Sequence, residues 1–124
     1  MKDEEDGGGA IEDLRKRTKR FALRAITLFV ALPKAPEAQI LGKQFVRSAT
    51  SAGAHHREAK RAKSDADFVS KMEGGLQELE ESQYWLELLS ESGIVTPTRL
   101  NAILAESEEL IAIFVSIVKK AKGS

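Results

Sequence analysis

Hydrophobic residues recur every three or four positions along most of the chain, which is the period of an α-helix and not of a strand. Four stretches show this pattern, and prolines and glycines separate them. The spacing predicts helices over residues 11–32, 36–63, 65–92 and 97–122. Long helices joined by short turns pack beside one another in alternating directions. The sequence therefore predicts an all-α fold, an antiparallel up-down-up-down four-helix bundle.

The ends of these helices carry recognisable signals. Pro33 stops the first helix, because the residue before a proline is disfavoured in the helical conformation. Ser64, three residues before Asp67, resembles the capping box that begins a helix. We expect Gly93 at the left-handed position that ends the third helix. Pro97 is suited to the first turn of the fourth.

Each predicted helix has one stripe of residues that we expect in the core, since side chains three and four positions apart share a helix face. The stripes are Ile11, Leu14, Thr18, Phe21, Ala25, Leu28 and Leu32; Ala38, Leu41, Phe45, Ala49, Ala52, His56 and Ala59; Phe68, Met72, Gly75, Leu79, Ser82, Leu86 and Leu89; and Leu100, Ile103, Ser107, Leu110, Phe114, Ile117 and Ala121.

More hydrophobic residues remain than these stripes use. The surplus residues are Leu23, Ile26, Phe29 and Val30 in the first helix, Tyr84, Trp85 and Leu88 in the third, and Ile111, Ile113, Val115 and Val118 in the fourth. Contiguous exposed hydrophobic surface marks contacts between proteins. We therefore expect a homo-oligomer; the alternative is a wider core within one chain.

The length of 124 residues suits one domain. The first ten residues, MKDEEDGGGA, are acidic and glycine-rich, so we expect residues 1–10 to be a disordered tail before a bundle domain over residues 11–122. They do not resemble a secretory signal. The most hydrophobic run, residues 110–118, spans only about 14 Å as a helix, against about 30 Å for a bilayer core. With no cysteine in the chain, we expect a cytoplasmic protein with no membrane partner.

Charge sums to zero, with 19 basic and 19 acidic residues, but it is unevenly distributed. Basic residues crowd the first predicted helix and the end of the second, whereas acidic residues crowd the third, and the fourth carries Glu106, Glu108 and Glu109. Clustered lysines and arginines can contact nucleic-acid phosphates; the alternative is a set of solvated faces and salt bridges. The candidate nucleic-acid-binding residues are Arg15, Lys16, Arg17, Lys19, Arg20, Arg24, Arg57, Lys60 and Arg61.

The segment RSATSAGAHHREA, residues 47–59, combines small and polar side chains. The small ones predict a close contact between helices, which would offset the cost of about 1 kcal/mol for Gly53 inside a helix. It lacks the pattern of a phosphate-binding loop. Four polar residues share one helix face, as an interface network, a channel lining or a binding site. They are Arg47, Ser51, His55 and Glu58.

This polar stripe is also where chemistry would have to occur. His55 and Glu58 supply two metal ligands but no second pair, so we predict no metal site and no cofactor. An enzyme would need the four side chains to converge in a pocket at a subunit boundary, and no nucleophile, base and orienting group can be identified. We therefore predict no catalytic residues and a protein that is not an enzyme.

The run RSATSAGAHHREAKRAKSDADFVSKM, followed by LQELEESQYWLELL, resembles the four-helix bundle family found in intervening sequences of bacterial 23S rRNA genes. The resemblance covers about residues 11–120. The matching residues are Arg47, Ser48, Thr50, Ser51, Gly53, Ala54, Glu58 and Ala59, then Phe68, Lys71, Glu78, Glu81, Tyr84, Trp85, Leu86 and Leu88. The family usually has Asn at the position of His55 and often Tyr at that of His56; histidine would make such a contact sensitive to pH.

The resemblance implies homopentameric rings of bundles, and the genomic setting of the family suggests RNA. A more distant similarity links it to accessory proteins of diversity-generating retroelements, which are pentameric bundles that bind nucleic acid and a reverse transcriptase. We therefore expect a non-enzymatic homo-oligomer, a pentamer, that binds RNA or other nucleic acid through its first two helices. The alternative is a protein-interaction scaffold or retroelement accessory factor without direct nucleic-acid binding.

Overall fold

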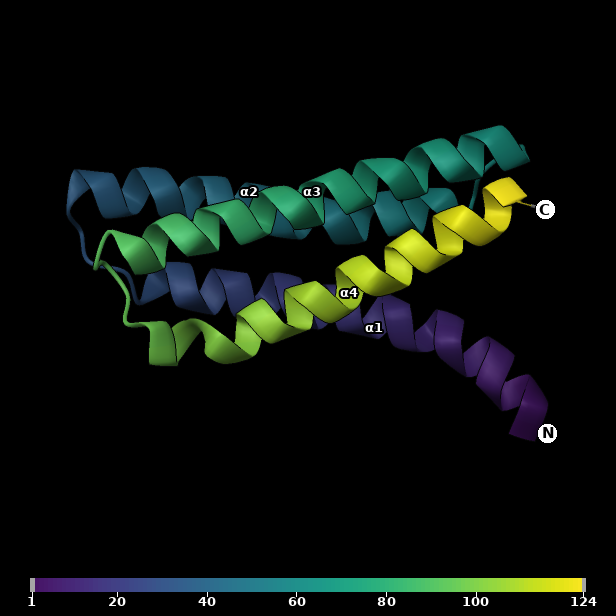
Figure 1. Cartoon of the computed structure of the whole chain (residues 1–124), viewed down its shortest axis with the longest axis horizontal. Helices are drawn as coiled ribbons and strands as arrows, with labels where there is room; N and C mark the ends of the chain where they lie inside the picture. Colours follow the sequence, from purple (N-terminus) through teal and green to yellow (C-terminus); the bar gives the residue numbers. More distant parts are fainter. Residues whose placement is uncertain (1, 124) are drawn as a thin grey trace.

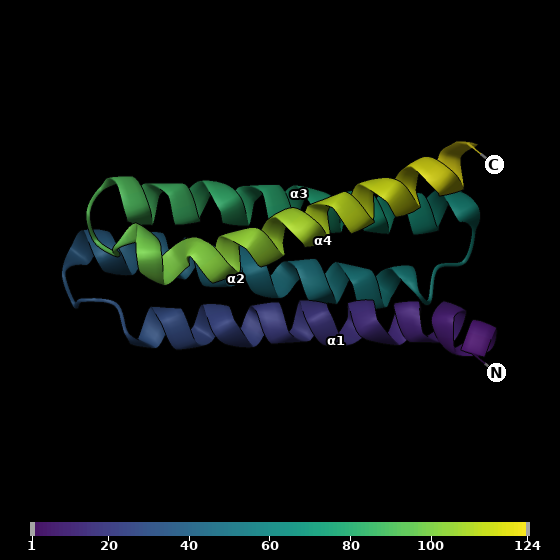
Figure 2. The same ribbon diagram turned by 60° about the horizontal axis from the view of Figure 1, so that its bottom comes forward.

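The computed structural model describes residues 14–123 in full, and the four predicted helices are present. They are α1 (Lys2–Val30), α2 (Pro36–Ala59), α3 (Asp65–Glu91) and α4 (Pro97–Gly123). Successive helices run in opposite directions side by side, so the predicted antiparallel four-helix bundle is confirmed (Figures 1 and 2). The pair α2 and α3 shares the most extensive contact, whereas α1 and α4 touch least. The tail predicted for residues 1–10 lies outside the residues described in full.

Two of the predicted helix ends are confirmed by their cap geometry. The Ser64 Oγ atom accepts a hydrogen bond from the Asp67 backbone N–H group at 3.0 Å, which begins α3. Gly93 has a φ angle of 81°, the left-handed conformation that glycine adopts without steric cost. The capping serine and the glycine therefore predicted both ends of α3 correctly, because each acts only on neighbouring residues.

Helix α2 ends at Ala59, four residues before the predicted end, although residues 60–63 favour helix formation. Arg61 and Ala62 donate their backbone N–H groups to carbonyls three residues back, at 3.0 Å each, in a tighter turn. The Lys63 N–H group then donates to the Asp67 carboxylate at 3.3 Å. Because Ser64 must be extended to cap α3, the chain leaves the helix early, and this requirement overrides local propensity.

The predicted stripes form the core, and every stripe residue that the structure describes in full is buried or half-buried. Phe21 and Phe45 pack edge to face with ring centroids 6.2 Å apart, which joins α1 to α2. The surplus residues of α4 are also buried or half-buried, so the alternative of a wider core is correct for that helix. In α1, however, Leu23, Ile26 and Val30 remain exposed.

The contact between α2 and α3 is close because its residues are small. Ser48 and Ser82 are fully buried, and their Oγ atoms lie 2.8 Å apart in a hydrogen bond. A Cβ atom added at Gly75 would lie 2.7 Å from Cε2 of Phe114 and 3.4 Å from the carbonyl oxygen of Ala52. At Gly53 the nearest atom would be Oγ1 of Thr18 at 3.4 Å. Gly75 of α3 therefore makes room chiefly for Phe114 of α4, and Gly53 of α2 faces Thr18 of α1.

Within residues 14–123, no helix is both long enough and hydrophobic enough to cross a lipid bilayer.

Candidate nucleic-acid interface

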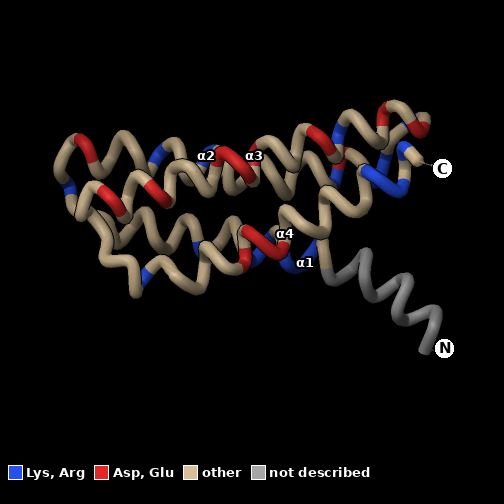
Figure 3. Tube along the Cα trace, in the orientation of Figure 1, with Lys and Arg blue, Asp and Glu red and all other residues tan. Residues whose placement is uncertain are grey.

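Four of the candidate basic residues come together where α1 lies beside the end of α2. Arg15, Arg57, Lys60 and Arg61 line an open groove of about 440 Å³ together with Glu58, and all five side chains are exposed. Figure 3 shows basic positions in α1 and around the turn between α2 and α3, whereas acidic positions follow α3 and the middle of α4. We call this feature the basic groove. It combines Arg15 of α1 with Arg57 at the end of α2 and with Lys60 and Arg61 of the turn that follows.

The other candidate basic residues lie along α1 outside the groove. Lys16, Lys19 and Arg20 are exposed, and Arg24 is half-buried. They extend the positive charge of α1 away from the groove, toward the middle of the bundle. A nucleic-acid strand whose phosphates entered the groove would therefore meet further cations along α1.

Arg17 has a different setting, because α4 holds its guanidinium group. Its Nε and Nη2 atoms donate to the Glu106 carboxylate at 3.0 and 2.8 Å, and Nη2 also donates to Glu109 at 2.7 Å. The hydrogen bonds from Glu106 and Glu109 raise the pKa of Arg17 above its ordinary value. Arg17 thus connects α1 to α4, the pair of helices with the smallest contact.

Arg47, the first residue of the predicted polar stripe, belongs to a network between α2 and α3. Its Nε atom donates to Gln44 at 3.1 Å, and its Nη1 atom donates to Glu78 at 3.4 Å. Its Nη2 atom donates to Glu81, whose carboxylate also accepts the indole N–H group of Trp85 at 3.1 Å. Of the three roles left open by the sequence, Arg47 therefore has that of an interface network.

His55 packs its half-buried ring against α3. A Cβ atom at Gly74 would lie 2.9 Å from two atoms of this ring, so the absence of a side chain at Gly74 makes room for histidine. The Nδ1 atom of His55 lies 4.0 Å from Glu58. Sequence reasoning did not single out Gly74; the pair of adjacent glycines inside a helix was the available signal.

The four stripe residues do not converge in one pocket. Arg47 pairs with α3, Ser51 is half-buried along α2, and only Glu58 lines the basic groove. Among residues 14–123, no three His, Asp or Glu side chains gather closely enough to hold a metal ion. The arrangement can therefore bridge helices and present cations, which is the chemistry of an anion-binding surface.

His56 lies beneath the basic groove and is only 5% exposed. Its ring centroid lies 6.2 Å from that of Phe114, and its Nδ1 atom is buried without a hydrogen-bond partner. Burial lowers the pKa of His56 below its ordinary value of 6.5, and the charges of Lys60, Arg57 and Arg15 lower it further. The imidazole is therefore neutral at pH 7, and the positive charges of three groove residues disfavour its protonation.

The lowered pKa of His56 predicts that stability falls in mild acid. Below its ordinary pKa of 6.5 the unfolded chain binds a proton at His56 while the folded chain resists it, so the free energy of unfolding decreases as pH is lowered. We expect urea titrations to show the highest stability above about pH 6.5 and a decline from there toward the folded-state pKa. His56→Leu should flatten this part of the profile, and His55→Leu should keep it. Equal slopes in the wild type and His56→Leu would contradict the prediction.

Comparison with known proteins gives a family match that covers most of the bundle. The family model described as 23S rRNA-intervening sequence protein matches residues 13–116. A crystal structure of a protein with unknown function from the S23 ribosomal protein family of Bacteroides thetaiotaomicron superimposes with a TM-score of 0.83 at 35% sequence identity. The match covers 88% of this chain and 97% of that one. No curated protein sequence matches the chain. Since the family model spans most of the bundle and the solved relative shares its fold, the chain belongs to the 23S rRNA-intervening sequence protein family.

Proposed function

We propose that this chain is a non-enzymatic, homo-oligomeric bundle that binds RNA through the basic groove. The observation that carries the proposal is the convergence of Arg15, Arg57, Lys60 and Arg61, from two helices, in one exposed groove. Lysine and arginine neutralise phosphates and release their counterions, which is the main source of affinity in most nucleic-acid complexes. Three of the four are arginines, whose planar guanidinium group can bind a phosphate through two parallel hydrogen bonds.

The attraction is local, because the whole chain carries no net charge. Glu58 lies among the cations and reduces the net positive charge of the groove. Most acidic residues follow α3 and the middle of α4. An RNA strand approaching the acidic residues of α3 meets repulsion, so the charge pattern orients the strand toward α1 and the end of α2. The family description connects these proteins to sequences within 23S rRNA genes, which favours RNA over DNA.

The oligomeric part of the proposal rests on α1. Leu23, Ile26 and Val30 are 53%, 43% and 69% exposed, and their spacing of three and four places them on one helix face. Ile40 and Tyr84 are also more than half exposed. Burial of this face against other copies would remove hydrophobic area from water. The resemblance to the family implies five copies.

We expect the double substitution Arg57→Glu/Arg61→Glu to weaken RNA binding at least roughly tenfold in moderate salt, because it turns two phosphate contacts into repulsions. Both side chains are exposed, so folding should be unchanged. The measurement is fluorescence anisotropy with a labelled, structured RNA at about 50 and about 200 mM KCl, where the salt slope should fall by about 2.

The matched control is Lys34→Glu/Lys43→Glu, which makes the same change in charge at exposed positions near the opposite end of the bundle. Its affinity for RNA should stay close to that of the wild type. Absence of binding by the wild type at both salt concentrations would refute the RNA proposal and would leave the protein-interaction scaffold.

A further inference from the structure

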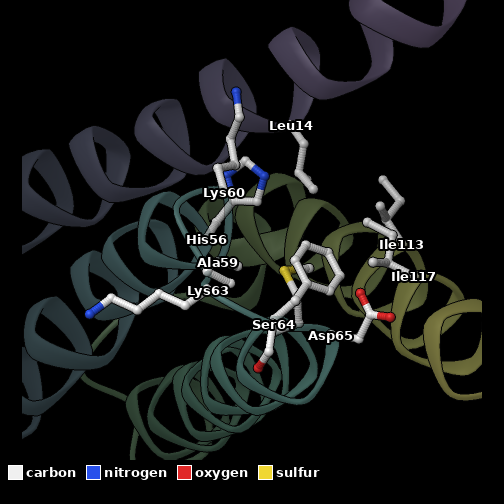
Figure 4. Close-up of a pocket in the computed structure, with 12 residues that line it drawn as sticks. Leu14, His56, Ala59, Lys60, Lys63, Ser64, Asp65, Ile113 and Ile117 are labelled. Atoms are coloured by element: carbon white, nitrogen blue, oxygen red, sulfur yellow. The ribbon is translucent and has the colours of Figure 1, made fainter.

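A second pocket, of about 800 Å³, adjoins the basic groove. All four helices contribute hydrophobic side chains to it, and His56, Lys63 and Asp65 are among its polar lining residues (Figure 4). The wall residues are Leu14, Phe68, Met72, Ile113 and Ile117. We call it the apolar pocket. Its volume lies in the range of about 300 to 1,000 Å³ that is typical of ligand sites.

Lys60 lines both the apolar pocket and the basic groove. Figure 4 shows its side chain beside the ring of His56, with Leu14 next to them and with Ile113 and Ile117 across the pocket. A molecule that filled the pocket while its negative charge lay in the groove would thus pass Lys60. Such a molecule needs a hydrophobic body and, a few bonds away from it, an anionic group.

His56 gives the pocket a polar wall. The side chain is nineteen-twentieths buried, and its Nδ1 atom has no hydrogen-bond partner. A buried polar atom without a partner costs free energy that a ligand can recover. The neutral imidazole has one donor and one acceptor, and a ring flip exchanges the two nitrogens. The ring of His56 therefore adds a polar group to the lining of an otherwise largely hydrophobic pocket.

A nucleotide has the properties that the apolar pocket and the basic groove together require of a ligand. A nucleobase has flat hydrophobic faces and a polar edge, and the phosphate one sugar away carries the charge. Single-stranded RNA is recognised by bases that leave the stack and pack on aromatic side chains. We propose that the apolar pocket receives an unpaired base, packed against Phe68, from an RNA strand whose phosphates lie in the basic groove. This inference rests on the proposed function and adds that the RNA must offer an unpaired nucleotide.

The test compares one RNA hairpin in two forms, blunt and with a short single-stranded overhang. The wild type should bind the overhang form roughly tenfold more tightly, as expected for one stacked base. Ile117→Trp fills the pocket without removing hydrophobic surface and should abolish this preference while affinity for the blunt form is kept. Ile111→Trp, at a half-buried position of α4 outside the pocket, is the matched control and should keep the preference.

A second measurement does not depend on a variant. With 2-aminopurine in the overhang, binding to the wild type should quench its fluorescence, because the base stacks on Phe68. Phe68→Leu, which retains the hydrophobic wall without the ring, should reduce the quenching.

The outcomes separate this inference from the proposed function. Equal binding of both hairpins by the wild type, or an unchanged preference in Ile117→Trp, overturns the base pocket and leaves RNA binding by the groove in place. A fall in particle mass on Ile117→Trp overturns it in favour of a subunit contact at the pocket. Absence of binding to either hairpin refutes the proposed function itself, and the inference with it.

Discussion

Replacement of Gly75 by valine is expected to destabilise the bundle by about 3 kcal/mol, which is a large part of the stability of a small domain. The new Cβ atom would lie 2.7 Å from Cε2 of Phe114 and 3.4 Å from the carbonyl oxygen of Ala52. Phe114 is fully buried and a carbonyl of α2 is rigid, so neither can move without displacing the core. The measurement is urea unfolding followed by circular dichroism at a fixed protein concentration, because the proposed assembly would add to apparent stability.

Gly53→Ala is the matched control for this prediction. Gly53 is also inside a helix, but its added Cβ atom would meet only Oγ1 of Thr18 at 3.4 Å. The gain in helix propensity, up to about 1 kcal/mol, should then leave the variant at least as stable as the wild type. If Gly75→Val were as stable as Gly53→Ala, the lack of space beside Phe114 would not be the reason for glycine at position 75.

The double substitution Leu23→Glu/Ile26→Glu is expected to convert the oligomer into monomers. The new carboxylates would lie on the hydrophobic face of α1 that is proposed to contact another copy, and burial of carboxylates costs far more than the contact returns. The wild type should scatter light as a particle of about five times the 13.6 kDa of one chain. The variant should scatter as one chain and keep its helical circular dichroism, because both positions are exposed in the bundle.

Ser116→Glu provides the control, since Ser116 is exposed on α4, away from the hydrophobic face of α1, and is polar already. Its mass should match that of the wild type. A wild-type protein of 13.6 kDa at micromolar concentration would refute the oligomer, and the exposed residues of α1 would then be ordinary surface.

The fold followed from local signals because each of them acts within one or two helical turns. Ser64 and Gly93 mark the ends of α3 through hydrogen bonds and a backbone angle that depend on few neighbours. The end of α2 was placed four residues too late, since residues 60–63 are good helix formers and only the cap of the next helix requires them to leave. Periodicity alone also did not show that the surplus residues of α4 pack into the core.

The candidate site was less predictable, because it depends on which helices face each other. The sequence indicated that α1 and α2 are basic, but not that Arg15 meets Arg57 in a groove while Arg17 turns toward the carboxylates of α4. The apolar pocket was not predicted at all. Its walls come from single positions in separate helices, each of which fits a core stripe when considered alone.

The hydroxyl pair between Ser48 and Ser82 has a consequence for the alignment of the two central helices. A contact made of alanine, glycine and serine has a smooth surface, and smooth surfaces can slide past each other by a whole turn with little change in area. A shift by a whole turn would break the hydrogen bond between the two buried hydroxyl groups, although each would keep its bond to a carbonyl of its own helix. The hydroxyl pair thus favours one position of α3 along α2, and the ion pairs of Arg47 with Glu78 and Glu81 favour the same position.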